Sequence, residues 1–163
     1  MLKQLLLCTA LIAPALAEPS APSVGAPNEA KAMLERAVVE VKANKTEAFT
    51  KFNHNEPPFR DRDLFVFCFN RIDGKFTAHE AFVSRDVREL RDAAGAPFGA
   101  RMYTSAQEGR INEVAFISPI PGSTELKVKS AFVTRIGDQV CGVSSYQVDS
   151  QGGVVKTAQG QRW

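Results

Sequence analysis

The chain has 163 residues and a formal net charge of +2, and its positive and negative side chains are interspersed. This length suits one domain with a hydrophobic core, and the balanced charge argues against a nucleic-acid partner. Residues 1–17 are typical of a secretory signal peptide, because a short positive start precedes an apolar run that ends in small residues. The mature protein is therefore expected to be soluble and either periplasmic or secreted.

Two segments are expected ahead of the sheet. Residues 18–27 hold three prolines among alanine and serine, which indicates an extended leader. Asn28 is expected to cap a helix in which apolar residues recur about every 3.6 positions as far as Asn53. The apolar stripe falters after Ala43, which predicts either a kink or a second helix start capped by Asn44 or Thr46.

Five strands are expected after this helix. Leu64–Phe69 is apolar at every position, so it should be a central strand covered on both faces. Asp73-Gly74 is a hairpin-turn signal, and further strands are expected at residues 75–79, 111–118, 124–136 and 139–146. A short helix is predicted from Pro97 to about Ala106. The fold class is therefore α+β, with a long N-terminal helix packed on a five-stranded antiparallel sheet.

Two cysteines, Cys68 and Cys141, remain after removal of the signal peptide. In an oxidising compartment an even pair indicates a disulfide, and two buried thiols that pack as small hydrophobic groups are the alternative. Each cysteine lies in an apolar strand, so the local sequence leaves both alternatives open. Redox sensing is disfavoured, because a reactive thiol needs exposure to solvent.

A series of short motifs runs in order through most of the chain. They are Phe52-Asn53, Asp63-Leu64-Phe65-Val66-Phe67, Asp73-Gly74 with Ala78-His79, Arg91-Asp92-Ala93-Ala94-Gly95-Ala96-Pro97-Phe98, Pro121 with Lys129-Ser130-Ala131-Phe132, and Gly142 with Tyr146. Together they resemble the single Cache domain of type 2, an extracytoplasmic sensory module with a PAS-like sheet. The resemblance places this domain at residues 28–147 and leaves residues 148–163 as a polar tail.

The resemblance implies a free-standing sensor or binding protein for a small, anionic metabolite, either an organic acid or an amino-acid-like ligand. The ligand would lie between the sheet and the loops of residues 80–108, without a cofactor. The expected ligand-binding residues are His79 and Lys129 for polar recognition, with Phe65, Phe67, Phe116, Phe132 and Tyr146 as apolar walls. The family also places its first and last strands side by side, which favours a bond between Cys68 and Cys141.

The chain departs from the family pattern at several positions. Phe116 and Phe132 stand where the family usually carries tyrosine, and Ser84-Arg85 replaces a Gly-Lys pair. The loss of two hydroxyl groups removes two potential hydrogen-bond donors. The pocket is therefore expected to differ from that of the family's usual small-carboxylate binders.

Other functions are weighed against this one. The first alternative is an interaction module without a small ligand, which would dock its sheet edge or long helix on a membrane-bound receptor. A sensor that signals would also need such a receptor as its partner. An enzyme on an NTF2-like scaffold would need His79 to converge with Asp63 or Asp92 in one cavity, and no enzyme is expected. A metal site built from His54, Asp61 and Asp63 matches no known ligand spacing, so no metal is expected.

Overall fold

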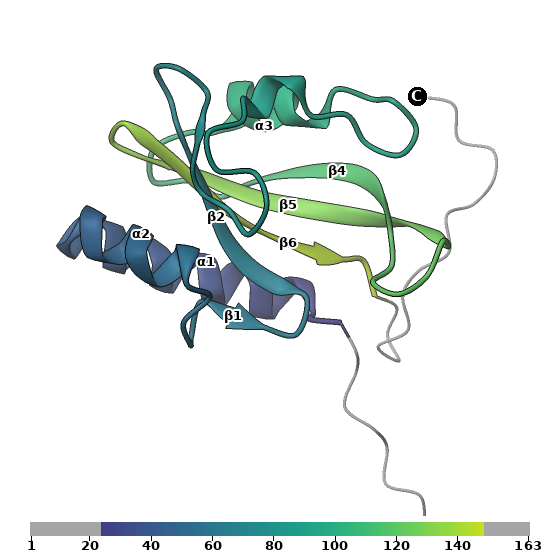
Figure 1. The fold of residues 1–163 in the computed structure, drawn as a ribbon, viewed down its shortest axis with the longest axis horizontal. Coiled ribbons are helices and arrows are strands. Elements are labelled where there is room, and N and C mark those ends of the chain that lie inside the picture. Colours follow the sequence, from purple (N-terminus) through teal and green to yellow (C-terminus); the bar gives the residue numbers. More distant parts are fainter. Residues whose placement is uncertain (1–23, 149–163) are drawn as a thin grey trace, which may run out of the picture.

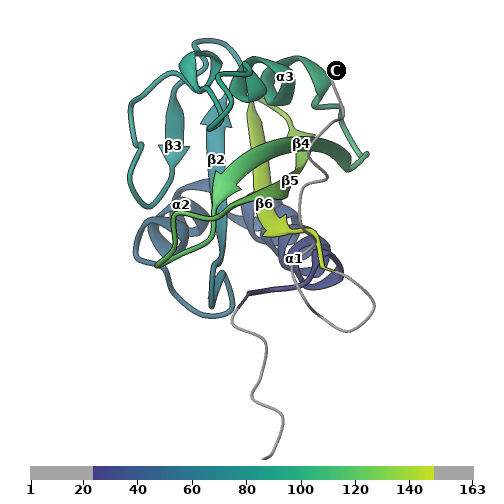
Figure 2. The same ribbon diagram turned by 90° about the vertical axis from the view of Figure 1, so that its right-hand side faces the viewer.

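The computed structural model describes residues 24–148. The expected signal peptide, most of the Pro-rich leader and almost all of the polar tail lie outside the described residues. Helices α1 and α2 cover one face of a curved antiparallel sheet, and helix α3 lies over the other face (Figures 1 and 2). No helix among the described residues is long and apolar enough to cross a membrane.

Helix α1 (Pro27–Ala43) begins one residue before the expected cap at Asn28. The N-cap is Ala26, whose backbone N–H donates to Glu29 Oε2 at 2.7 Å. A proline is well placed in the first turn, because the backbone N–H that it lacks has no partner there within the helix. The prediction of Asn28 as the cap is therefore wrong, since the proline and the Glu29 carboxylate already define the start.

The expected break in the long helix is confirmed. Asn44 ends α1 and caps α2 (Lys45–Asn53), because its side-chain oxygen accepts the backbone N–H of Glu47 at 3.2 Å. The two helices bury one apolar stripe against the sheet. Its fully or almost fully buried members are Ala30, Met33, Leu34, Ala37, Val41, Ala48 and Phe52.

The sheet contains six strands, one more than expected. They are β1 (Arg60–Asp61), β2 (Leu64–Asn70), β3 (Phe76–Ala78), β4 (Asn112–Pro119), β5 (Leu126–Ile136) and β6 (Gln139–Tyr146). Their order is β1-β2-β6-β5-β4. Strand β1 pairs with the first two residues of β2, and β3 pairs with β2 further along, at Cys68 and Phe69. The extra strand, β1, is only two residues long and carries no apolar pattern that a sequence could display.

Strand β2 is central, as its apolar sequence predicts. Leu64, Val66 and Cys68 belong to the core beneath α1 and α2, whereas Phe67 and Phe69 belong to a second core on the opposite face. This division follows from the alternation of side chains along a strand. The sheet therefore has two buried faces, and the second one borders the cavity described below.

A disulfide links β2 to β6 at the centre of the sheet. Cys68 and Cys141 are direct partners in the antiparallel register, and both are fully buried. The bond joins residues 73 positions apart. The open choice between bonded and free thiols is thus decided by strand register.

The second face is covered by a loop that contains the short helix η1 (Val87–Glu89) and by α3 (Phe98–Ser105). Gly99 lets α3 approach this loop, because a Cβ at that position would lie 1.8 Å from the carbonyl oxygen of Val87. The helix expected from Pro97 to Ala106 is confirmed to within one residue at each end. The loop and α3 together form the roof of the cavity.

Candidate ligand-binding site

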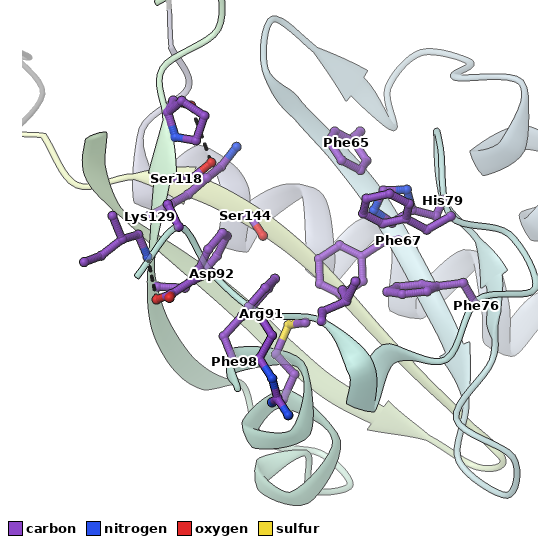
Figure 3. Close-up of a pocket in the computed structure, with 17 residues that line it drawn as sticks. Phe65, Phe67, Phe76, His79, Arg91, Asp92, Phe98, Ser118, Lys129 and Ser144 are labelled. Atoms are coloured by element: carbon purple, nitrogen blue, oxygen red, sulfur yellow. Dashed lines mark hydrogen bonds between the residues drawn. The ribbon is translucent and has the colours of Figure 1, made fainter. Parts of the chain in front are cut away.

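A pocket of about 430 Å³ lies between the second face of the sheet and this roof (Figure 3). Its apolar lining is Phe65, Phe67, Phe76, Phe82, Leu90, Ala93, Phe98, Met102, Phe116, Ile117 and Pro119. Its polar lining is His79, Arg91, Asp92, Ser118, Lys129 and Ser144. A cavity with mostly apolar walls and a few polar side chains has the usual character of a small-molecule site.

Phenylalanine rings supply most of the wall. Phe98 on α3 stacks on Phe116 of β4, with ring centroids 4.4 Å apart and planes 13° apart. Phe67 reaches across β6 because Gly142 leaves room for its ring, where a Cβ would lie 2.5 Å from Phe67 Cζ. Of the residues expected as apolar walls, Phe65, Phe67 and Phe116 therefore line the pocket.

Phe132 and Tyr146 do not line it, contrary to the expectation. Phe132 lies three positions from Lys129 on β5, so it faces the helices, where Lys31 Nζ lies 4.7 Å from its ring centroid. Tyr146 is on the pocket side but is fully buried, and its hydroxyl donates to the carbonyl oxygen of Pro119. Its ring instead packs against a pocket residue, Lys129.

Lys129 lies directly opposite Tyr146 in the register of β5 and β6. Its Nζ is 4.5 Å from the Tyr146 ring centroid and 3.5 Å from Asp63 Oδ2. The two charged side chains are 11% and 6% exposed, so the ion pair is buried. Burial lowers the pKa of Lys129, and the nearby Asp63 carboxylate opposes that shift.

His79 follows β3 and is enclosed by the rings of Phe65, Phe67, Phe76 and Phe82. Its Nδ1 accepts the backbone N–H of Ala81 at 3.0 Å, so the neutral ring carries its proton on Nε2. Burial lowers the pKa of His79 to about 4. The residue is therefore a neutral N–H donor at pH 7, not a cation.

Replacing His79 by asparagine is expected to make the protein less sensitive to acid. The unfolded chain protonates His79 near pH 6.5 and the folded chain only near pH 4, so stability is lost as the pH falls between these values. For this partly exposed side chain we expect a loss of about 1–2 kcal/mol. Urea unfolding at pH 7 and pH 4.5 measures it, and an equal loss in wild type and His79→Asn would contradict the prediction.

Lys129 and His79 lie on opposite sides of the pocket (Figure 3). Lys129 is on β5, and His79 follows β3, with β6 and β2 between these strands. Three strand spacings correspond to roughly 14 Å. The two residues therefore cannot hold one carboxylate together, and each can contact only its own end of a ligand.

Asp92 is a pocket residue that was not expected to bind a ligand. Its carboxylate accepts backbone N–H groups from Ala94 at 3.0 Å, Ala96 at 2.8 Å and Ile117 at 3.1 Å. The last of these hydrogen bonds ties the roof loop to β4. The sequence signal was the turn that begins at Asp92, which indicates backbone hydrogen bonding by the side chain.

The acid–base arrangement that an enzyme would need is not formed by the three candidate residues. His79 is enclosed by rings at one end of the pocket, whereas Asp63 pairs with Lys129 at the other. The carboxylate of Asp92 is already engaged by three backbone N–H groups. Within residues 24–148, no group of three or more His, Cys, Asp or Glu side chains could hold a metal ion.

No family model and no curated protein matches the sequence. Solved structures do resemble the fold. A methyl-accepting chemotaxis protein from Vibrio parahaemolyticus RIMD 2210633 has a TM-score of 0.57 at 19% identity, covering 72% of this chain and 85% of that chain. The periplasmic sensor domain of a chemotaxis protein has a TM-score of 0.53 at 18% identity, covering 75% and 90%.

A third structure, which explains carboxylic acid recognition by a Cache chemosensory domain, has a TM-score of 0.50 at 15% identity and covers 75% of this chain and 88% of that chain. The second of these structures is a sensor domain and the third is a Cache chemosensory domain. The chain therefore has a Cache-like sensor-domain fold.

Proposed function

We propose that this chain is a free-standing, periplasmic binding or sensor protein for an organic acid with one anionic end and an apolar body the size of an aromatic ring. The observation that carries the proposal is the buried Lys129 ammonium at one end of a phenylalanine-lined cavity. A buried cation in an apolar cavity favours a complementary anion, and the rings favour an apolar body. The domain proposed at residues 28–147 contains the whole site.

The charges around the pocket favour an acid over an amino acid. An α-ammonium group would need a carboxylate as its partner. Asp92 is engaged by backbone N–H groups, and Asp63 does not line the pocket. A ligand carboxylate can instead approach Lys129 beside the hydroxyl groups of Ser118 and Ser144, which also line the pocket.

The three similar solved structures support the sensory role. Two of them come from chemotaxis proteins, and the third is a Cache chemosensory domain that recognises carboxylic acids. For signalling, the bound form would have to act on a membrane-bound receptor. The signal peptide proposed at residues 1–17 would deliver the protein to the compartment where such a receptor displays its sensor region.

Isothermal titration with three probes tests this function. We expect 3-phenylpropionate to bind at least about tenfold more tightly than propionate, because ring burial adds more than 1.4 kcal/mol. The neutral amide, 3-phenylpropanamide, should bind more weakly than the acid, because it cannot pair with Lys129. Equal affinity for acid and amide, or no heat with any of the three, would contradict the proposal.

The matched variants are Lys129→Met and Lys127→Met. Both lysines are buried on β5, but Lys127 pairs with Glu125 at 2.5 Å and does not line the pocket. Only Lys129→Met is expected to remove the preference for the acid over the amide. A similar loss in Lys127→Met would show that the effect is not specific to the pocket.

A further inference from the structure

Asp63 makes two contacts that belong to different parts of the molecule. Its Oδ2 lies 3.5 Å from Lys129 Nζ at the pocket end of β5, and it accepts no hydrogen bond from the described residues. Its Oδ1 accepts the backbone N–H of Gly25 at 2.6 Å, just ahead of α1. One buried carboxylate thus stands between the proposed ligand site and the segment that leads into the first helix.

The lead-in segment, residues 24–26, is held by neighbouring groups as well. Arg62 Nη1 donates to the carbonyl oxygen of Val24 at 3.2 Å, and Arg62 Nη2 pairs with Glu29 Oε1 at 2.8 Å. Gly25 also packs tightly, because a Cβ there would lie 2.3 Å from Leu64 Cγ. The segment is therefore docked on the start of β2, next to Asp63.

We propose that Asp63 couples ligand binding at Lys129 to the docking of the lead-in segment. This inference rests on the proposed function, and it adds a way in which ligand binding in the pocket changes the docking of residues 24–26 outside it. A ligand carboxylate at Lys129 shares the ammonium with Asp63 and repels the Asp63 carboxylate. Because a buried charge without a full counter-charge is costly, the docked position of Asp63 becomes less favourable.

The expected consequence is a looser lead-in segment. When Asp63 moves toward solvent, Gly25 loses the acceptor of its backbone N–H, and the adjacent first turn of α1 loses a fixed neighbour. Lys129 itself has little freedom to leave the pocket, because its ammonium lies over the Tyr146 ring. Coupling of this kind is reciprocal, so a change that loosens the segment should strengthen ligand binding by the same factor.

Hydrogen–deuterium exchange of the mature protein tests the coupling without requiring a ligand. In Lys129→Met, which leaves Asp63 without its counter-charge, exchange at residues 24–30 is expected to rise at least tenfold relative to wild type, and by more than exchange in β6. In the double variant Asp63→Asn/Lys129→Met, the uncharged side chain can still accept from Gly25, so slow exchange should return. The control Lys127→Met should behave as wild type.

A ligand arm uses 3-phenylpropionate at saturating concentration. Wild type is expected to exchange faster at residues 24–30 and more slowly at pocket residues, while the single variant Asp63→Asn should show protection of the pocket alone. This second variant keeps the test valid if Lys129→Met does not fold.

The outcomes separate the two proposals. If residues 24–30 exchange as slowly in Lys129→Met as in the control Lys127→Met, the coupling is overturned, whether or not an acid binds. Pocket protection without faster exchange of the segment also overturns it and leaves the proposed function intact. A segment that loosens in Lys129→Met, in a protein that binds none of the acids, supports the coupling and overturns the ligand class.

Discussion

Replacing Cys68 and Cys141 together by alanine is expected to lower the free energy of unfolding by about 4 kcal/mol, because a cross-link restricts the unfolded chain. The bond spans 73 residues, so the loop that it closes is long. Both side chains are fully buried, so the alanines also lose packing contacts. For a domain of this size, we expect the melting temperature to fall by roughly 10 °C or more.

Urea unfolding with and without reductant measures this effect and isolates the cross-link. Wild type unfolded in the presence of dithiothreitol should lose most of the same stability, because its unfolded chain is then no longer constrained. The double alanine variant should be insensitive to the reductant. Coincident unfolding midpoints for wild type and the variant, both without reductant, would contradict the prediction.

The Lys129→Met substitution is expected to cost about 3 kcal/mol of stability, because removing one partner of a buried ion pair leaves the other charge uncompensated. Asp63 is only 6% exposed, so water cannot replace the lost ammonium. The double variant Asp63→Asn/Lys129→Met should lose less than the sum of its two single variants, with a coupling of about 1–3 kcal/mol.

Denaturant unfolding of the four proteins in this cycle measures the coupling, and Lys127→Met provides the control. The partner of Lys127 is an exposed carboxylate, which solvent can hydrate when the lysine is lost. We therefore expect the control to change stability by no more than about 1 kcal/mol. Strictly additive effects of Asp63→Asn and Lys129→Met would show that the ion pair contributes nothing to folding.

Most elements of the fold could be predicted from local sequence. The apolar run of β2 marks a strand covered on both faces, and Asn44 marks a second helix start because its side chain can cap one. The elements that escaped prediction have weak local signals. Strand β1 is held by pairing with β2 over two residues, and η1 is a single short turn in the roof loop.

The site was partly predictable. Lys129, His79, Phe65, Phe67 and Phe116 do line one pocket. The three-residue spacing of Lys129 and Phe132 already places them on opposite faces of a regular strand, so alternation along β5 was the stronger guide there. Tyr146 lies on the pocket face of its strand but is covered by Lys129. No pattern within one strand can reveal such a contact between strands.

The sequence by itself determined the α+β class and the succession of helices and strands. These features follow from periodicity and turn chemistry, which depend on residues close together in the chain. Only the tertiary structure decided which distant residues meet. Strand register joins Cys68 to Cys141, and the strand order β2-β6-β5 brings Asp63, just before β2, within 3.5 Å of Lys129 on β5. The same strand order keeps His79 away from that pair.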